Sequence, residues 1–103
     1  MTWPTVVERL PGDGTSRYES HAVAGPGGVM TDEVGVITGE VTVRTEIAGG
    51  RATVRIQYFE ADEWYEIEGS PLGLTADPGP RLHQEIVQAV QRGLPEGLKD
   101  FHP

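Results

Sequence analysis

The side chains that could do chemistry in this sequence are few and scattered. The histidines are His21, His83 and His102, and the serines are Ser16, Ser20 and Ser70. None falls in a nucleophile-elbow or His-Glu-x-x-His pattern. The chain has no cysteine, which excludes disulfides, thiolate zinc sites and cysteine nucleophiles. We therefore expect no catalytic residues, no cofactor and no metal site.

His21 is the titratable residue with the most interesting expected neighbour. Residues 17–24 and 29–37 flank a Gly-Pro-Gly-Gly loop and are predicted to pair as a hairpin. A four-residue loop would set Ala24 opposite Val29 and His21 opposite Asp32. A carboxylate there would orient the imidazole and favour its charged form, as in half of an acid–base site. The plainer interpretation is a surface histidine with a nearby acid.

The strongest compositional anomaly is an acidic run, Glu60, Asp62, Glu63, Glu66 and Glu68, which contains no Lys or Arg. A calcium site is one interpretation, because carboxylates suit hard cations, but the spacing matches no loop motif. A solvated strand edge that resists edge-to-edge association is the second. An acidic patch that steers a basic partner is the third.

These residues are positioned by a predicted three-stranded meander over residues 39–48, 51–60 and 63–69. Apolar side chains alternate along the first strand, and Gly49-Gly50 suits a two-residue turn. That turn sets Val41 opposite Tyr58, Val43 opposite Ile56, Thr45 opposite Val54 and Ile47 opposite Ala52. The next turn, at residues 60–63, would set Tyr58 opposite Tyr65, Ile56 opposite Ile67 and Arg55 opposite Glu68.

The same pairing places Phe59 opposite Trp64 on the outer face of the meander. An aromatic pair ringed by charged groups resembles an interface hot spot. The alternative is that the first strand or the segment around Trp3 covers the rings and makes a second, minor core.

One helix is predicted over about residues 78–92. Asp77 can cap it, and Leu82, Ile86, Ala89 and Val90 form one apolar stripe. Gly93 and Pro95 end it. His83 lies on the flank of the stripe as a partly buried histidine. Near the N-terminus, residues 5–8 fit either a capping box that begins a short helix or a short edge strand.

The expected fold is therefore α+β. An antiparallel four- to five-stranded sheet, built from an N-terminal hairpin and the meander, packs one C-terminal helix on one face. The 103 residues make a single domain: an N-terminal segment (1–14), the sheet (15–69), a loop (70–77), the helix and a tail (93–103). Leu94, Leu98 and Phe101 either tuck the tail down or leave it frayed.

The net charge of −8 argues against a nucleic-acid-binding face and against docking on anionic membranes. We expect a cytoplasmic protein with no membrane span. The first hypothesis is a non-enzymatic interaction module for a basic protein partner, by analogy with antitoxins, immunity proteins or secretion chaperones, with homodimerisation through the same face as a variant. Its contact residues would be Arg55, Phe59, Glu60, Asp62, Glu63, Trp64, Glu66 and Glu68.

The alternative hypothesis is a small-molecule-binding domain or small enzyme with a pocket between sheet and helix. The residues expected to reach into that pocket are Tyr18, His21, Asp32, Tyr58, Tyr65 and His83. Mimicry of nucleic acid by carboxylates is a third idea, although the sequence offers one acidic segment and not a double row.

Overall fold

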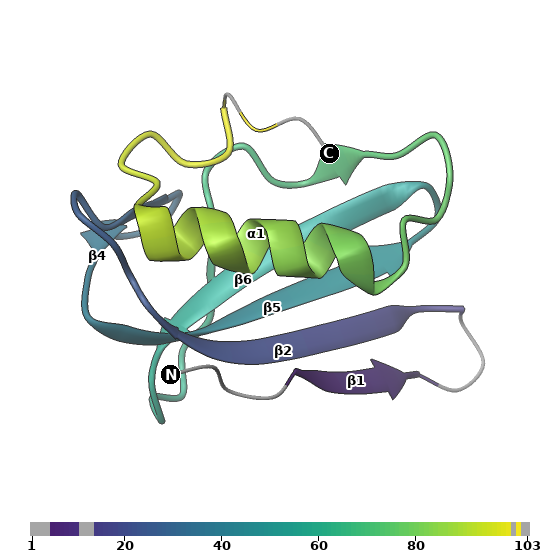
Figure 1. Ribbon diagram of the computed structural model, residues 1–103, viewed down its shortest axis with the longest axis horizontal. Helices are drawn as coiled ribbons and strands as arrows, with labels where there is room; N and C mark the ends of the chain where they lie inside the picture. The colour runs from purple at the N-terminus through teal and green to yellow at the C-terminus, as the bar shows by residue number, and fades with distance from the viewer. Residues whose placement is uncertain (1–4, 11–13, 100, 102–103) are drawn as a thin grey trace.

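The computed structural model describes residues 5–10, 14–99 and 101. The elements in chain order are β1 (Val6–Arg9), β2 (Ser16–Val23), β3 (Val29–Thr31), β4 (Gly35–Ile37), β5 (Glu40–Ala48), β6 (Arg51–Tyr58), β7 (Tyr65–Glu66), β8 (Leu72–Gly73) and α1 (Pro80–Arg92). The main antiparallel sheet has the order β1-β2-β5-β6-β7, with β8 also paired to β6. Helix α1 runs along one face of it (Figure 1), which confirms the predicted α+β fold. This sheet has six strands, where four to five were predicted.

The central hairpin of β5 and β6 has the predicted register. Val41 lies opposite Tyr58 and Val43 opposite Ile56, and every second residue of both strands is buried apart from the end of β6. Gly49 and Gly50 have φ angles of 57° and 76°, which the tight turn requires and which other residues rarely adopt. The alternating pattern and the turn chemistry thus select one register together.

The predicted register of the third meander strand is wrong by two residues. Ile56 lies opposite Tyr65, not Ile67, and Arg55 lies opposite Glu66, not Glu68. A shift of two keeps each side chain on its expected face, so Ile67 is still fully buried, and its N–H donates to the Val54 carbonyl at 3.0 Å.

The cause of the shift is an earlier turn after β6, over residues 58–61 and not 60–63. The Phe59 N–H donates to the Glu40 carbonyl of β5 at 3.1 Å, so the pairing with β5 extends to the start of this turn. A turn then brings the Ala61 N–H to the Tyr58 carbonyl at 2.9 Å, with Glu60 at a φ of 65°. The return strand begins only at Tyr65, and Phe59 and Trp64 are not a cross-strand pair.

The predicted upstream hairpin is also wrong. β2 pairs with β1 and β5, while β3 and β4 form a separate two-stranded sheet, so His21 lies opposite Thr42 and not Asp32. The Gly-Pro-Gly-Gly loop does form a turn, in which the Gly28 N–H donates to the Gly25 carbonyl at 3.0 Å, but it packs on the end of α1, and β3 then lies beside Leu94 and not beside β2. The Gly25 N–H donates to the Val90 carbonyl at 2.9 Å, and a Cβ atom on Gly25 would lie 2.3 Å from the Gln91 carbonyl oxygen.

The N-terminal segment forms the edge strand β1 and no helix between Val6 and Arg9. All four of its residues are exposed. The pairing of Val6 with Glu19 fixes this strand beside β2. The described residues therefore favour the strand over the capping-box helix, and Trp3 lies outside them.

Helix α1 begins at Pro80, two residues later than predicted, because Gly79 is its N-cap. The Asp77 carboxylate accepts a hydrogen bond from the Gly79 N–H at 2.8 Å, in the turn that precedes the helix. Gly93 ends α1 as expected. The apolar stripe of the helix is buried against the inner face of the sheet, and Leu98 of the tail is buried with it. Within the described residues, no helix is long and apolar enough to cross a membrane.

Candidate functional site

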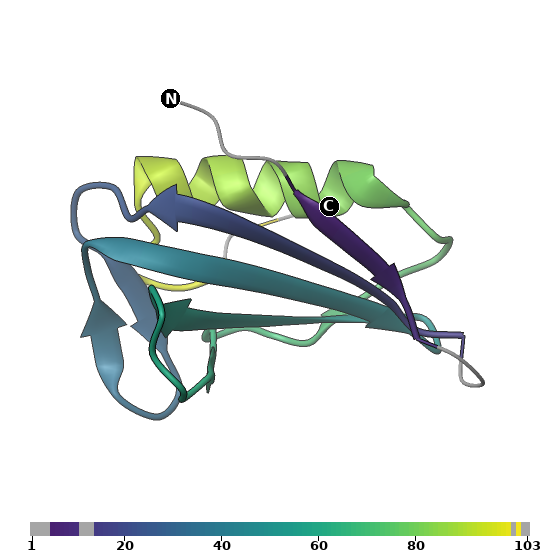
Figure 2. The same ribbon diagram turned by 90° about the horizontal axis from the view of Figure 1, so that it is seen from below.

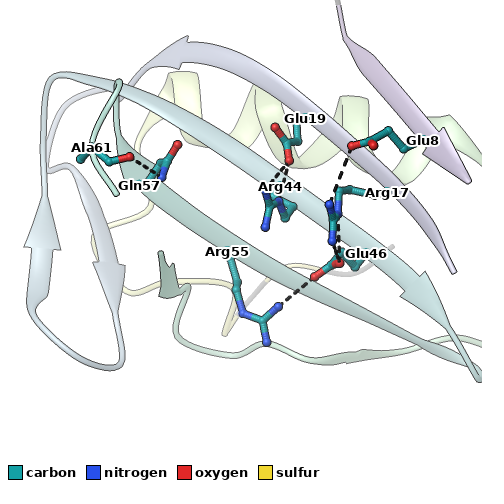
Figure 3. A network of polar contacts seen from close by, with 8 residues as sticks. All are labelled: Glu8, Arg17, Glu19, Arg44, Glu46, Arg55, Gln57 and Ala61. Carbon is teal, nitrogen blue, oxygen red and sulfur yellow. Dashed lines mark hydrogen bonds and ion pairs between the residues drawn. The ribbon is translucent and has the colours of Figure 1, made fainter. Parts of the chain in front are cut away.

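The main sheet presents two chemically different faces. Alternate residues of β2, β5 and β6 point toward α1 and are buried, and the residues between them point to the opposite, outer face. Figure 2 shows α1 lying along the inner face, and Figure 3 views the sheet from the outer face. Since period-two alternation sorts every strand residue to one face, each face can be analysed separately.

The centre of the outer face is an ion-pair network. It consists of a chain of four residues, Glu8, Arg17, Glu46 and Arg55, and a separate pair, Glu19 and Arg44, beside it (Figure 3). Glu46 lies between two arginines, 3.0 Å from Arg17 and 2.9 Å from Arg55. The hydrogen bond from Arg17 to Glu46 raises the pKa of that guanidinium. Arg44 and Arg55 are cross-strand neighbours, so the carboxylates beside them offset a repulsion that would otherwise destabilise the sheet.

The two predicted hot-spot aromatics lie at one end of this face, each held by a different partner. The Phe59 ring stacks on the His21 ring with centroids 4.1 Å apart and planes 6° apart. The Arg44 guanidinium lies 3.9 Å from the centroid of the Trp64 ring. Gln57 donates to the Ala61 carbonyl at 2.9 Å, which holds the connecting loop against the outer face (Figure 3).

His21 has a different carboxylate neighbour from the one expected. Its Nε2 lies 3.7 Å from the Glu40 carboxylate, on the adjacent strand β5. Asp32 lies on the β3–β4 turn, where its N–H donates to the Glu66 carbonyl at 2.9 Å. The predicted His21–Asp32 pair is therefore absent, because β3 does not pair with β2.

The acidic run has gained neighbours that are distant in the sequence. Glu33 accepts a hydrogen bond from the Glu66 N–H at 3.0 Å, so the exposed β3–β4 turn adds Asp32 and Glu33 beside β7. We define the acidic–aromatic surface as Phe59, Trp64 and the carboxylates of Asp32, Glu33, Glu40, Glu60, Asp62, Glu63 and Glu66. No sequence signal linked the β3–β4 turn to the run, because their contact depends on tertiary packing.

The inner face contains a buried chain of hydrogen bonds centred on His83. This fully buried residue has its Nε2 2.8 Å from the Ser20 hydroxyl and its Nδ1 2.8 Å from the Thr45 hydroxyl. Ser20 is in turn 2.8 Å from the Thr5 hydroxyl. The Tyr18 ring stacks on the imidazole at 5.7 Å between centroids. Burial lowers the pKa of His83 to about 4, so the ring is neutral at neutral pH.

A serine hydroxyl bonded to an imidazole that is bonded to a third group is the arrangement that activates a nucleophile in many enzymes. Here the third group is the Thr45 hydroxyl and not a carboxylate, and a ring with a pKa of about 4 is a weaker proton acceptor than an ordinary histidine. The arrangement suits a neutral link that joins α1 to β2 and β5. The alternation of β5 placed Thr45 inward, but the helix position that faces it could not be deduced from the sequence.

The six residues expected to share a pocket do not converge. Tyr18 and His83 are together in the core, whereas His21 stacks on the outer face. Tyr58 is exposed, and Tyr65 lies in β7, where its hydroxyl is 3.4 Å from the Glu63 carboxylate. Partial desolvation, followed by the charge of Glu63, raises the pKa of Tyr65.

No protein family, curated protein or solved structure matches this chain in the comparisons with known proteins. Among the described residues, no group of three histidine, aspartate or glutamate side chains could hold a metal ion. His102 lies outside the described residues.

Proposed function

We propose that this protein is a non-enzymatic interaction module that binds a basic protein partner through the acidic–aromatic surface. The observation that supports this most directly is the state of Phe59. The residue is 41% exposed, yet its ring is held by the stack on His21, with centroids 4.1 Å apart, and the Glu40 carboxylate lies 3.7 Å from His21.

A ring that is exposed and already oriented is well suited to binding. Aromatic side chains contribute large contact area, and an ordered one loses less conformational entropy when a partner covers it. Trp64 adds a second ring, which Arg44 orients.

The charges favour a basic partner. Glu60, Asp62 and Glu63 are exposed next to Phe59, in a chain whose net charge is −8. Such a patch attracts Lys- and Arg-rich surfaces and accelerates their association, an effect that salt screens. Arg55 is paired with Glu46, and Glu68 lies beside β3, so we centre the contact on Phe59. The absence of cysteine is compatible with a role in the cytoplasm.

The test is an NMR titration of the whole chain with a Lys/Arg-rich peptide that also carries one aromatic residue. We expect amide shifts to change at residues 58–64 and 32–33, with weaker binding at high salt. Phe59→Ala should weaken binding by about tenfold or more, as a hot-spot truncation does. Val36→Ala, which alters an equally exposed side chain on β4, is the matched control.

Three results would contradict the proposal. The first is equal binding by Phe59→Ala and the unmodified chain. The second is shift changes spread over all surface carboxylates, which would indicate charge attraction alone. The third is concentration-dependent self-association centred on Phe59, which would assign the surface to a second copy of the chain.

A further inference from the structure

We propose a second binding site in the groove between α1 and the end of β2, next to the acidic–aromatic surface, with which it shares His21 as a neighbour. We infer that it takes a small uncharged ligand that carries hydroxyl or amide groups. The groove has a volume of about 320 Å³ and is lined by Thr5, Ser20, His21, Gln84, Val87, Gln88 and Gln91. That volume is at the lower end of the range of small-molecule sites.

The lining is rich in neutral hydrogen-bonding groups. Gln84, Gln88 and Gln91 recur at i, i+4 and i+7, which places them along one side of α1. Each carboxamide can donate and accept hydrogen bonds. Val87 between them gives the groove one apolar contact.

Charge is missing from this lining, which is unusual in a chain with 16 acidic and 8 basic residues. No Asp, Glu, Lys or Arg of the described part of the chain lines the groove. A charged ligand would lose hydration there without gaining an opposite charge, whereas a neutral polar ligand would exchange water for the carboxamides. The lining therefore favours an uncharged ligand.

The hydroxyl end of the groove is connected to the core. The groove residues Thr5 and Ser20 are the outer members of the chain that continues through His83 to Thr45. A neutral imidazole has one N–H donor and one acceptor nitrogen, so the chain of hydrogen bonds has a direction that depends on the tautomer.

Each tautomer of His83 presents a different group at the groove. With the proton on Nδ1, the ring donates to Thr45 and accepts from Ser20, which accepts from Thr5. The Thr5 oxygen then has a lone pair available to accept from a ligand. With the proton on Nε2, the ring donates to Ser20, Ser20 donates to Thr5, and the Thr5 hydrogen is available to donate.

The same buried groups stay satisfied in both arrangements, so the groove can meet either a donor or an acceptor. A ligand bound at Thr5 would select one tautomer, and the tautomer of His83 would report that the groove is occupied. Because Thr5 is exposed while Ser20 and His83 are buried, the ligand needs to contact only the outer hydroxyl.

The experiment uses two neutral probes, N-acetylglucosamine and N-acetylglycinamide, and their charged counterparts, glucosamine and N-acetylglycine. NMR spectra of the whole chain would follow the side-chain amides of Gln84 and Gln88 and the imidazole nitrogens of His83. We expect the neutral probes to shift these amides and to change the imidazole nitrogen shifts toward one tautomer. The charged counterparts should have little effect.

Variants separate the site from nonspecific association. Thr5→Val removes the outer hydroxyl and Gln88→Ala removes one carboxamide, so each should weaken probe binding by about two- to tenfold, read from the shifts of the Gln84 side-chain amide. Thr53→Val changes a similar side chain on the outer face and should leave them unchanged. The proposal is overturned if neither neutral probe shifts the groove amides, if charged probes act equally, or if Thr5→Val responds like the parent.

Discussion

The polar side chains on the inner face of β2 and β5 are neutral, whereas many of those on the outer face are charged. On the inner face, Thr45 and Ser20 satisfy a neutral His83 whose pKa is lowered by burial. On the outer face, the neighbouring residues Arg44 and Glu46 are charged and take part in ion pairs. One residue along the same strand separates the two chemistries.

Solvent access accounts for the difference. The Glu46 side chain is 17% exposed and that of Arg17 is 25% exposed, so these ions keep part of their hydration. A fully buried ion loses all of it, at a cost that a pair of hydroxyls cannot repay. Depth in the fold, more than residue type, therefore decides which polar groups of this sheet are charged.

The largest contrast is expected between apolar and polar positions of β6. Ile56→Ala empties space in the core and should lower the free energy of unfolding by about 2–5 kcal/mol. Gln57→Ala, on the outer face, should lower it by less than about 1 kcal/mol. Urea denaturation measures both. A similar loss in the two variants would contradict the assignment of the faces.

Acid should destabilise the protein through His83. Its pKa falls from 6.5 in the unfolded chain to about 4 in the folded one, so only the unfolded state binds a proton in that range. The resulting stability is fully present above pH 6.5 and is lost as the pH falls toward about 4. The loss should reach roughly 3 kcal/mol.

The pH effect is isolated by comparison with His83→Gln, which removes the titrating ring. Denaturation curves for both proteins over this range give the difference in slope. We expect the unmodified chain to lose more stability than the variant on acidification. Parallel pH profiles would show that His83 does not remain neutral in the folded state.

Removing one threonine hydroxyl from β5 should lower stability more on the inner face than on the outer face. Thr45→Val leaves the Nδ1 atom of His83 without its partner and should cost about 1–3 kcal/mol of stability. Thr42→Val, on the outer face of the same strand, should change stability by less than about 0.5 kcal/mol. Thermal or chemical denaturation measures the stability of both variants. Equal losses would contradict a stabilising role for the buried hydrogen bond between Thr45 and His83.

The smallest expected effect concerns the ion-pair network. Glu46→Gln leaves Arg17 and Arg55 without their shared carboxylate and should cost about 1 kcal/mol, less at high salt. Glu85→Gln breaks only the exposed helical pair with Arg81 and should cost less than about 0.5 kcal/mol. If the two variants are equally stable, the network adds nothing beyond ordinary surface pairs.

Local patterns were sufficient to predict the central hairpin and the helix. The alternation of β5 and β6 and the Gly49-Gly50 turn lie within one short segment, and the Gly93 C-cap adjoins the apolar stripe that it ends. The predicted register of the third strand was wrong by two residues because the chain turns at residues 58–61, earlier than the predicted turn at 60–63. A shift of two leaves the alternation of faces unchanged, so the pattern could not reveal it.

The candidate sites were likewise predictable in part, because the sequence shows their composition but not their three-dimensional contacts. The acidic run and its aromatic neighbours were visible as composition, but their arrangement was not. The contacts of Phe59 with His21 and of Trp64 with Arg44 join the β6–β7 connection to β2 and β5, and the contact of Glu33 with Glu66 joins the β3–β4 turn to β7. The partners of His83 come from β2 and β5.

The sequence by itself determined which residues alternate, where the tight turn and the helix end fall, and that negative charge gathers near residues 60–68. These properties depend on neighbours along the chain, whose spacing is fixed by covalent geometry. The tertiary structure alone decided that β2 joins β5, that His83 is neutral between two hydroxyls, and that the outer aromatics are held by His21 and Arg44. Each of those outcomes depends on burial and on groups from distant segments, because desolvation and hydrogen bonding act through space and not along the chain.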